Sequence, residues 1–579
     1  MFIPIRKYTF NTVNRKSLYQ IFGLNIGGNR VFRILFTIIF FLWFASYVSA
    51  EEILVGGTLA EDEIWTNENV YVVYKDLRIP AGITLTIQSG VTVKVDQGRG
   101  ILVLGGNLMV NGRQNNEIDS VNFLPNHVEL RDGWKWKGIS YTGVSGSELN
   151  KISYANITDA EIAIDIYNSQ QVRIENTCIL NNQNIGARLY NSKDCSIIDC
   201  LLQDNYDGIE IVATNGSEAS GNFVKGCILK NSNHNLYLLK AYGGIFINNL
   251  VENNLIEGGN NGIWMDDGGG EAYGRNTISK NILINNGAGE GFAILLAQDS
   301  IDITNNIFWK NHMALFYDPY TSGSHVSNNS FYQNQYGITL STGSEGNEFL
   351  NNTFSSNEVT IFDMRESGDF VFSATNIFPM PEQENIIINK TQNDVDLDNN
   401  YWHVASDEYI PKLIYDKNDD PILGVIYYEP VLSEADTTNP VSPPFRVIKQ
   451  LVDGDVKISW FSNPEKDQKS YKVYFGGFEN YSFQNALSAS IDTSFLLSGV
   501  DISDSIAVTA LDSTLMLADA QVNGHESPFA FALPYPYAGD DATICKNQDA
   551  VQIMGGTVPY SYLSISWFTS GDGYFDDSN

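Results

Sequence analysis

Basic residues are scarce in this sequence, which has 35 Lys and Arg against 68 Asp and Glu and a formal net charge of -33 over 579 residues. Nucleic-acid phosphates are bound by clustered Lys and Arg, so this shortage excludes DNA and RNA as partners. Charged residues of both signs make up only 18% of the chain, and aromatic residues make up 12%. That composition excludes a disordered chain, because enough apolar surface is available to form a core.

Potential metal and disulfide ligands are also scarce. Five Cys are too few for a disulfide framework in a chain of this length. The six His show no ligand spacing and the eight Met are scattered, so a zinc or copper centre is not expected. The 49 Gly, together with many Asn, Tyr, Val and Ile, favour an all-β exported protein over a helix-rich cytosolic enzyme.

Acidic residues are absent from residues 1–50, which have several Arg and Lys ahead of an uncharged run that starts at Ile34. The run ends in the small-residue pattern Val48-Ser49-Ala50. This arrangement predicts a secretory signal peptide that is cleaved after Ala50. The mature protein is then secreted, extracellular or attached to the cell surface, and it keeps no stable transmembrane span. The alternative is an uncleaved membrane anchor.

A short phrase recurs through the middle of the chain, for example TCILNN at Thr177, GCILKNS at Gly226, NILINN at Asn281 and NSFYQN at Asn329. The copies follow one another roughly every 22 to 28 residues, which is the signature of a solenoid. A leucine-rich repeat is excluded because its L-x-x-L-x-L pattern is absent. Each unit instead has an alternating segment such as GIWMD at Gly262, so each unit is predicted to form one coil of a parallel β-helix.

The fifth residue after the start of each repeated phrase is usually Asn. Asn tolerates the left-handed backbone conformation, and stacked Asn amides can hydrogen-bond from coil to coil. We therefore predict a structural turn ladder made of Asn182, Asp204, Asn231, Gly259, Asn286, Asn311, Asn334 and Asn357.

Three of the cysteines occupy corresponding places in adjacent repeats. Cys178, Cys200 and Cys227 are predicted to be buried thiols in one interior column. A disulfide between neighbours is the alternative, because adjacent coils are separated by about 4.8 Å.

Residues 51–430 resemble the right-handed parallel β-helix superfamily, the pectate-lyase-like proteins. The resemblance rests on the repeats, on GGTLAEDEIWTNENV and GILVLGGNLMVNG near the start, and on NNYWHVASDEYIPKL from Asn399. It implies an N-terminal cap and opening coils over 51–150, and further coils with a closing segment over 151–432. For activity the resemblance is less specific, because this superfamily contains lyases, hydrolases, epimerases and non-catalytic adhesins.

The C-terminal quarter is expected to form separate β-sandwich modules. EADTTNPVSPP provides a linker over 433–443. Residues 444–535 resemble a fibronectin type III module, with Trp460 as the expected core tryptophan. Residues 536–579 resemble the opening of the immunoglobulin-like repeats common in surface proteins of Bacteroidetes-type bacteria, and the domain is incomplete.

Alternation along the coils predicts one outward-facing column on the β-helix. With Ile164, Ile338 and Ile361 facing inward, the neighbouring column contains Tyr237, Trp264 and Phe316. A row of exposed aromatic rings suits the stacking of sugar rings, so these three residues are the predicted substrate-binding residues. The alternative is that a loop or the C-terminal modules cover this stripe. The complete predicted column is Asp165, Arg188, Glu210, Tyr237, Trp264, Leu295, Phe316, Thr339 and Phe362.

A second outward column contains the candidate catalytic residues. Asp266 and Asp318 are expected two coils apart, or about 10 Å. At the strand ends Lys240 is expected against Asp267, with Arg365 beside them. Paired carboxylates suit glycoside hydrolysis, whereas a Lys or Arg near carboxylates suits β-elimination from a uronic acid. A polar turn at the end of a strand is the structural alternative for Asp266 and Asp267.

Two family motifs of the resembling enzymes are incomplete in this sequence. The polygalacturonase-type motifs are reduced to the Asp pair, and the epimerase-type Asp-Pro-His is replaced by Asp318-Pro319-Tyr320. The loss of this histidine puts epimerase-type proton transfer in doubt.

Calcium is the one cofactor that the sequence suggests. Asp416, Asn418 and Asp420 present oxygen atoms at alternate positions, as do Asp394, Asp396 and Asp398. Neither group has the Gly and distal Glu of a complete calcium loop.

The leading hypothesis from the sequence is a secreted or cell-surface β-helix protein that binds polysaccharide and cleaves it as a lyase or glycosidase. The alternative is a non-catalytic adhesin or structural surface protein that uses the solenoid as a rigid scaffold. The sequence leaves open whether the protein is an enzyme, which glycan it engages and its oligomeric state.

Overall fold

The computed structural model of this chain describes residues 51–114, 118–126, 135–146, 149–269, 274–287, 289–366, 369–513 and 524–534. The predicted signal peptide at 1–50 and the immunoglobulin-like segment at 536–579 lie outside the described residues and stay predictions. No helix in the described part of the chain is long and apolar enough to cross a membrane. The only helical turns in the described solenoid are η1 (Asp407–Tyr409) and α3 (Ile410–Leu413).

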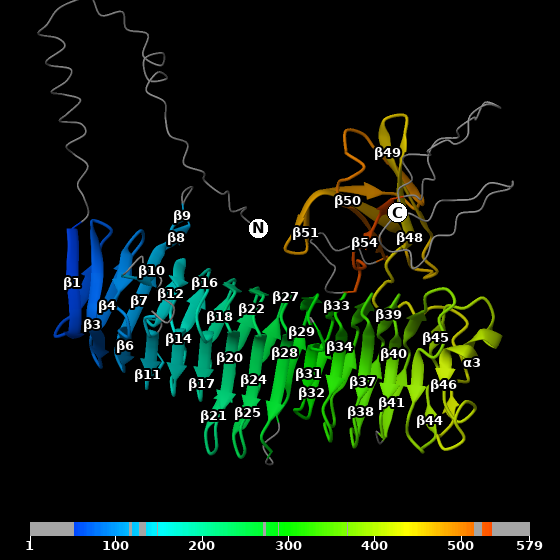
Figure 1. The fold of residues 1–579 in the computed structure, drawn as a ribbon, viewed down its shortest axis with the longest axis horizontal. Coiled ribbons are helices and arrows are strands. Elements are labelled where there is room, and N and C mark those ends of the chain that lie inside the picture. The colour runs from blue at the N-terminus through cyan, green and yellow to red at the C-terminus, as the bar shows by residue number, and fades with distance from the viewer. Residues whose placement is uncertain are drawn as a thin grey trace, which may run out of the picture. The chain divides into compact units, whose positions relative to one another are not determined.

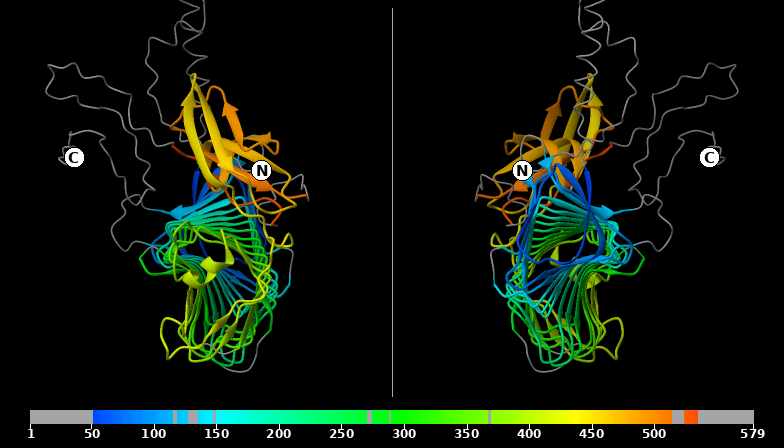
Figure 2. Two further views of the ribbon diagram at one scale, coloured as in Figure 1. Left: turned by 90° about the vertical axis from the view of Figure 1, so that its right-hand side faces the viewer. Right: turned by 90° about the vertical axis from the view of Figure 1, so that its left-hand side faces the viewer.

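Residues from Glu51 to about Tyr427 form a right-handed parallel β-helix, as the repeat predicts (Figure 1). Each coil has three short strands, for example β18 (Ser196–Ile198), β19 (Leu201–Gln203) and β20 (Asp207–Ala213). Strands of successive coils overlie one another when the stack is viewed end on (Figure 2). The fold follows from the alternation in the sequence, because each strand buries one set of side chains in the interior of the coil.

The strands make three parallel sheets, which we name sheets I, II and III. Sheet I includes β16 (Cys178–Leu180), β19, β23 (Ile228–Lys230), β27 (Leu255–Glu257), β30 (Ile282–Ile284), β33 (Ile307–Trp309) and β36 (Ser330–Tyr332). Sheet II includes β14 (Ile162–Tyr167), β17 (Ile185–Tyr190), β20, β24 (His234–Lys240), β28 (Asn261–Asp267), β31 (Phe292–Leu296), β34 (Met313–Tyr317), β37 (Tyr336–Leu340), β40 (Thr360–Met364) and β43 (Ile387–Asn389). Sheet III has 13 strands, including β18, β22 (Phe223–Lys225) and β29 (Asn276–Ser279).

The long strand β3 (Asn69–Pro80) joins the first two sheets. It pairs with β5 (Thr92–Val95) of sheet I and with β6 (Gly100–Leu104) of sheet II. Sheets I and II are therefore continuous at the N-terminal end of the solenoid.

The register of sheet II agrees with the prediction over most of its length. Tyr237 pairs with Trp264 and Lys240 pairs with Asp267, and Leu295 pairs with Phe316. The prediction is wrong at β40, where Ile338 pairs with Phe362. Phe362 is fully buried, and Asp363 takes the outward place opposite Thr339. Ile361 and Phe362 are both apolar and both buried, so alternation alone could not choose between them.

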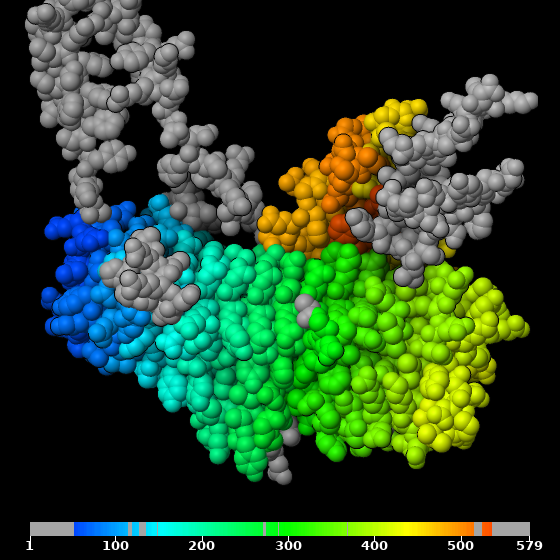
Figure 3. Space-filling view, in the orientation of Figure 1, coloured from blue at the N-terminus to red at the C-terminus, as the bar shows by residue number. Residues whose placement is uncertain are grey.

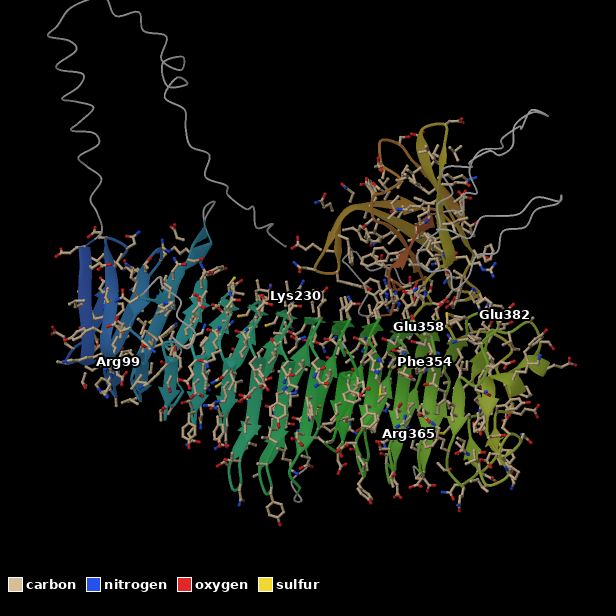
Figure 4. All side chains as sticks on the ribbon, in the orientation of Figure 1. Arg99, Lys230, Phe354, Glu358, Arg365 and Glu382 are labelled. Atoms are coloured by element: carbon tan, nitrogen blue, oxygen red, sulfur yellow. The ribbon has the colours of Figure 1, made fainter. Side chains whose placement is uncertain are left out.

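The interior of the solenoid is filled by aliphatic side chains and by stacked rings. Phe308, Phe331 and Phe354 form a continuous stack with ring centroids 4.6 and 4.5 Å apart. Phe354 is labelled in Figure 4. Stacks of this kind hold adjacent coils in register because the rings of neighbouring coils contact each other directly.

The predicted Asn ladder exists, but the turn residue and the ladder residue are two adjacent positions in each coil. The first position adopts the left-handed conformation, as Asp204 and Asn231 do with φ of 55°. The next residue points inward and forms the ladder, so Asn205 and Ser232 stand where Asp204 and Asn231 were predicted. The chain of buried amides then continues as Asn286, Asn311, Asn334 and Asn357, with Nδ2 to Oδ1 distances of 3.1, 2.9 and 3.1 Å.

A second buried ladder contains Asn254, Asn281, Asn306, Asn329 and Asn352. These Asn residues start the repeated phrase, and the sequence pattern alone did not indicate that they form a ladder. Each amide satisfies buried backbone groups of the neighbouring coils, which explains why polar residues are tolerated in the interior.

The cysteine column is only partly as predicted. Cys200 and Cys227 are buried, but Cys178 is half-buried and pairs with Leu201, one residue beyond Cys200. Cys178, Cys195, Cys200 and Cys227 are all free thiols, so the disulfide alternative is not supported. Burial raises the pKa of the Cys200 thiol.

Residues 445–534 contain two four-stranded sheets. One has the order β52 (Ser494–Leu497), β49 (Asp455–Phe461), β48 (Phe445–Val452) and β55 (Leu533–Pro534). The other has the order β51 (Ser482–Ala489), β50 (Ser470–Glu479), β53 (Ile506–Leu511) and β54 (Ala530–Phe531). Trp460 is buried in their shared core against Tyr471. The fibronectin type III assignment stays a prediction.

These C-terminal sheets contact the outer side of sheet I. Trp309 of β33 stacks on Phe531 at 5.5 Å. Ile284 and Tyr332 of the solenoid share one apolar cluster with Tyr481 and Phe529. The contact buries outward apolar residues of sheet I, so these residues need no further partner to shield them from water.

Candidate functional site

The outward side chains of sheet II form two parallel columns, which together we name the outer face. The first column is Asp165, Arg188, Glu210, Tyr237, Trp264, Leu295, Phe316, Thr339 and Asp363. The inward neighbours, such as Ile209, Leu236 and Ile263, are fully buried. The module contacts found on sheet I leave this face on a different side of the coil. On the surface, successive coils appear as neighbouring bands (Figure 3).

The second column follows two residues later on each strand. It contains Tyr167, Tyr190, Val212, Leu239 and Asp266. Backbone hydrogen bonds then continue the register beyond the strand ends: Asp318 donates to Leu296, Arg365 to Leu340 and Lys390 to Met364. Arg365 therefore lies in the column of Asp266 and Asp318, and not beside Asp267 as the slipped register implied.

The aromatic residues of the outer face lie on adjacent strands. The Tyr237 ring stacks on His234 at 5.4 Å, and Trp264 meets His234 edge to face at 4.9 Å. Phe316 lies two strands further along and contacts Phe292 at 4.9 Å. Tyr237, Trp264 and Phe316 are all half-buried. Packing between the rings fixes their orientation and leaves part of each ring accessible to a ligand.

Glu210 lies at the acidic end of this aromatic row. Burial, the adjacent carboxylate of Asp207 and a side-chain hydrogen bond with Asp207 together raise the pKa of Glu210 to about 7, against the opposing effect of Arg188 and His234. Asp207 in turn binds His234 Nδ1 through Oδ1 at 2.8 Å. Glu210 is therefore able to carry a proton near neutral pH.

The sequence analysis placed Glu210 in the outward column but did not identify its chemistry. The reason is that Asp207 and His234 are 27 residues apart in the chain and meet only because β20 pairs with β24. The contact could have been predicted from strand positions. β20 begins with a carboxylate and β24 begins with a His, and equal positions on strands of adjacent coils are neighbours.

Arg188 forms a bidentate pair with a neighbouring carboxylate. Its Nε and Nη2 atoms lie 2.9 and 3.0 Å from Asp165 Oδ1 and Oδ2. Its guanidinium carbon is 5.6 Å from the centre of the Tyr190 ring. This bidentate geometry occupies the fork that would otherwise recognise an anion.

Asp266 and Asp318 stand on the same column, as predicted, with Ala297 between them. The Tyr237 hydroxyl donates a 3.0 Å hydrogen bond to Asp266 Oδ2. Partial burial, together with the charge of Asp266, raises the pKa of Asp318. Burial and the neighbouring carboxylates raise the pKa of the Tyr237 phenol, so it remains protonated and acts as a donor.

Lys240 and Asp267 form a buried pair at the strand ends. Lys240 Nζ lies 3.0 and 3.2 Å from Asp267 Oδ1 and Oδ2, and the Lys240 side chain is only 2% exposed. Asp267 also accepts a hydrogen bond from the Gly269 backbone N–H at 2.7 Å. This arrangement satisfies both charges internally, which differs from the open base that elimination chemistry requires.

A second charged cluster lies at the opposite end of the outer face. Asp363 is buried and receives two cations: Arg365 Nε at 2.9 Å from Oδ2, and Lys390 Nζ at 3.0 Å from Oδ1. The side chains of Arg365 and Lys390 are 49% and 47% exposed. Arg365 is labelled on the outer face in Figure 4.

The side-chain oxygens of the suggested calcium ligands mainly accept hydrogen bonds from backbone N–H groups. Asp416 Oδ1 accepts from the Asn418 N–H and Oδ2 from the Ile426 N–H, both at 2.8 Å. Asp420 Oδ1 accepts from the Ile422 N–H. In the second group, Asp394 accepts from Val425 and Tyr427. These bonds define turns. Calcium coordination at these residues stays a prediction that would require several oxygens to reorient.

A family described as "NosD: Periplasmic copper-binding protein (NosD)" matches residues 114–320 and 184–406. No curated protein sequence matches the chain. Among solved structures, the chain is similar to a tailspike protein of E. coli bacteriophage HK620 in complex with pentasaccharide, at 10% identity over 79% of this chain and 86% of that chain, with a TM-score of 0.39.

Two enzyme structures are similar at comparable distance. An alginate lyase from Paenibacillus sp. str. FPU-7 has 12% identity over 51% of this chain and 92% of that chain, with a TM-score of 0.30. The catalytic unit of a GH87 alpha-1,3-glucanase from Streptomyces thermodiastaticus has 12% identity over 53% of this chain and 62% of that chain, with a TM-score of 0.35.

The copper in the family description can be tested against the side chains present. In the described ranges no three His, Cys, Asp or Glu residues lie together as a metal-binding group. Burial raises the pKa of the Cys195 thiol to about 12, which disfavours the thiolate that binds metals. The described histidines are instead engaged one by one, His234 by Asp207, His312 by Gln335, His325 by Glu348, His403 by Tyr401 and His525 by Asp512.

The described residues thus do not fit a copper centre, and we derive no copper chemistry from them. The repeated coils nevertheless carry the family pattern. Since the two overlapping matches together span just over half of the 579 residues, the chain belongs to the NosD family.

Proposed function

We propose that the outer face of sheet II binds polysaccharide. The observation that carries this proposal is the row of half-buried rings at Tyr237, Trp264 and Phe316 on the open side of a rigid sheet. Successive strands are spaced by about 4.8 Å, so a glycan lying along the solenoid axis meets a new side chain at each strand. Ring stacking would supply affinity, and neighbouring polar groups would fix the orientation of the sugar.

The second column supplies those polar groups. Asp266 and Asp318 follow the aromatic residues along the same direction and can accept hydrogen bonds from sugar hydroxyls. Asp266 is held in place by Tyr237, which reduces the entropy lost when a ligand binds. The signal peptide that the sequence predicts at 1–50 and the family described as periplasmic support a location outside the cytoplasm, where polysaccharides are accessible.

Cleavage of the bound glycan is the second candidate function. It is favoured by one observation, a carboxyl group on the outer face that stays protonated near neutral pH, with Glu210 at a pKa of about 7. Asp266 and Asp318 are two strands apart, about 10 Å, close to the carboxyl separation of about 6.5 to 9.5 Å in inverting glycosidases. We assign Lys240 and Asp267 to a structural pair and not to the chemistry.

The direct test is binding of the purified protein to a panel of neutral and acidic polysaccharides, measured by affinity electrophoresis and calorimetry. Trp264→Ala should weaken binding by at least about tenfold, as truncation of a central aromatic anchor does. Phe223→Ala is the matched control, because Phe223 is a 42% exposed aromatic residue on sheet III. Equal losses for both variants, or no binding to any polysaccharide, would contradict the proposal.

Cleavage is measured on the same panel by release of reducing ends and by ultraviolet absorbance of unsaturated sugar ends. Glu210→Gln should abolish a cleavage activity while preserving binding. Binding by the wild-type protein without either product would exclude the cleavage function for that panel and would support the non-catalytic adhesin.

A further inference from the structure

Arg365 presents a partly exposed guanidinium on the outer face. Among the residues that the structure describes, its side chain donates one hydrogen bond, from Nε to Asp363 Oδ2, which leaves the two terminal nitrogens for a ligand. The side chain is 49% exposed. A planar guanidinium that is fixed at Nε and open at its ends is suited to bidentate recognition of a carboxylate or sulfate group.

Lys390 places a second cation next to it. Lys390 directly follows the adjacent strand, β43, and continues the same column, and its ammonium group pairs with the Asp363 carboxylate. One buried carboxylate therefore holds two half-exposed cations, and the cluster has a net positive charge. Glu366, the next acidic residue, is directed to Thr342 at 3.4 Å.

The position of this cluster connects it to the aromatic row. Asp363 occupies the first column two strands beyond Phe316, and Arg365 occupies the second column two strands beyond Asp318. A ligand stacked on Trp264 and Phe316 would reach the cations after about 10 Å. On a chain with a net charge of -33, a local excess of positive charge on this face selects for anionic ligands over neutral ones.

We propose that Arg365 and Lys390, anchored by Asp363, form an anion subsite that binds the carboxylate or sulfate groups of an acidic polysaccharide lying on the outer face. This inference rests on the proposed polysaccharide-binding function and specifies its substrate class. It requires no metal ion, because the cations themselves compensate the charge of the glycan.

The experiment compares polygalacturonate with its fully methyl-esterified form, which has the same backbone without the charge. Dextran sulfate and dextran form the second pair and distinguish sulfate from carboxylate. Wild-type protein should bind the charged member of at least one pair about tenfold or more tightly, and this preference should weaken as salt is raised.

The variant Arg365→Gln/Lys390→Gln should remove that preference and keep binding to the neutral member. Asp363→Asn/Arg365→Gln/Lys390→Gln tests the same loss without leaving a buried carboxylate unpaired, so a folding defect of the first variant does not decide the outcome. Arg275→Gln/Lys280→Gln removes the same charge from residues 75% and 43% exposed at the sheet III side and should leave the preference intact.

An unchanged preference in both outer-face variants, or an equal loss in the Arg275→Gln/Lys280→Gln control, would overturn the anion subsite while polysaccharide binding stands. Equal wild-type affinity for charged and neutral members would also overturn it. Failure of wild-type protein to bind any member would overturn the proposed function itself.

Discussion

Arg188 and Arg365 both project from sheet II, yet they are used in opposite ways. Arg188 closes both arms of its hydrogen-bonding fork on Asp165 and packs near Tyr190. In the described part of the chain, Arg365 bonds to Asp363 through Nε, and Lys390 pairs with the same carboxylate. The same residue type therefore stabilises the sheet at one end of the outer face and remains available for a ligand at the other. The role of each arginine is therefore set by the position of its carboxylate partner and not by its residue type.

The two ends of the outer face also differ in their charged groups. Three further charged or titratable groups surround Glu210: Asp207 and His234, which bond to each other, and Arg188, which bonds to Asp165. Around Asp363 two cations share one anion. The aromatic row lies between an end that can release a proton and an end that can hold an anion. A glycan bound in one direction would thus meet different chemistry at its two ends.

The largest expected effect on stability concerns the buried ion pair of Lys240 and Asp267. Lys240→Met should lower the free energy of unfolding by about 3–5 kcal/mol, because Asp267 is left as a buried charge without its cation. Urea denaturation followed by circular dichroism measures the loss. Lys240→Met/Asp267→Asn should recover most of it, and a single-variant loss below about 1 kcal/mol would restore Lys240 as a catalytic candidate.

The second effect concerns the proton at Glu210. Burial and Asp207 raise its pKa from the ordinary carboxyl value of 4.5 to about 7 in the folded protein. The folded state therefore binds more protons than the unfolded state, and this group destabilises the fold as pH rises from about 4.5 to 7. Glu210→Gln should remove that loss. Its stability relative to wild type should increase by about 1–2 kcal/mol across this window, after a discount for solvent screening.

Thermal unfolding at several pH values measures the Glu210 effect. Arg188→Lys, which keeps the charge next to Glu210, is the matched control and should retain the wild-type pH dependence. A parallel pH profile for wild type and Glu210→Gln would show that Glu210 titrates normally.

The third effect directly compares the two arginines. Arg188→Gln should cost up to about 1 kcal/mol of stability because it breaks a half-exposed bidentate pair. Arg365→Gln should cost less, since Lys390 still pairs with Asp363. Chemical denaturation of both variants gives the order. A larger loss for Arg365→Gln would mean that its contact with Asp363 is mainly structural.

The smallest effect concerns the hydrogen bond between the columns. Tyr237→Phe should lower the free energy of unfolding by about 0.5–1.5 kcal/mol, the net value of one hydrogen bond. Ring stacking with His234 is kept, so glycan affinity should change less than in Trp264→Ala. Calorimetry of the two variants side by side provides the measurement, and equal losses of affinity would give the Tyr237 hydroxyl a direct role in binding.

Much of the fold could be predicted from the repeat. The pairs Tyr237 with Trp264 and Lys240 with Asp267 were predicted correctly, because a strict alternation places one side chain of each strand outside. The prediction failed where consecutive residues have the same polarity. Ile361 and Phe362 are both apolar, and Asp204 and Asn205 are both polar, so the choice between them depends on backbone conformation.

The candidate site was less predictable than the fold. Trp264, Phe316, Asp266 and Asp318 follow from their columns alone. The pKa of Glu210 depends on Asp207, Arg188 and His234, which come from three adjacent strands. Lys390 was missed because it belongs to the coil after β40, the strand at which the predicted register is wrong. Each error in register moves a residue to a different column and changes its neighbours.

The sequence by itself determined the coil period and, over most of the solenoid, which side of each strand is buried, since these depend on local alternation. The tertiary structure decided which outward residues touch one another, which carboxyl group has its pKa raised by its neighbours and how many hydrogen bonds each arginine makes to its carboxylate. The physical reason is that contacts between coils depend on backbone hydrogen bonds that join residues more than twenty positions apart. A single extra residue in a turn shifts all of them together.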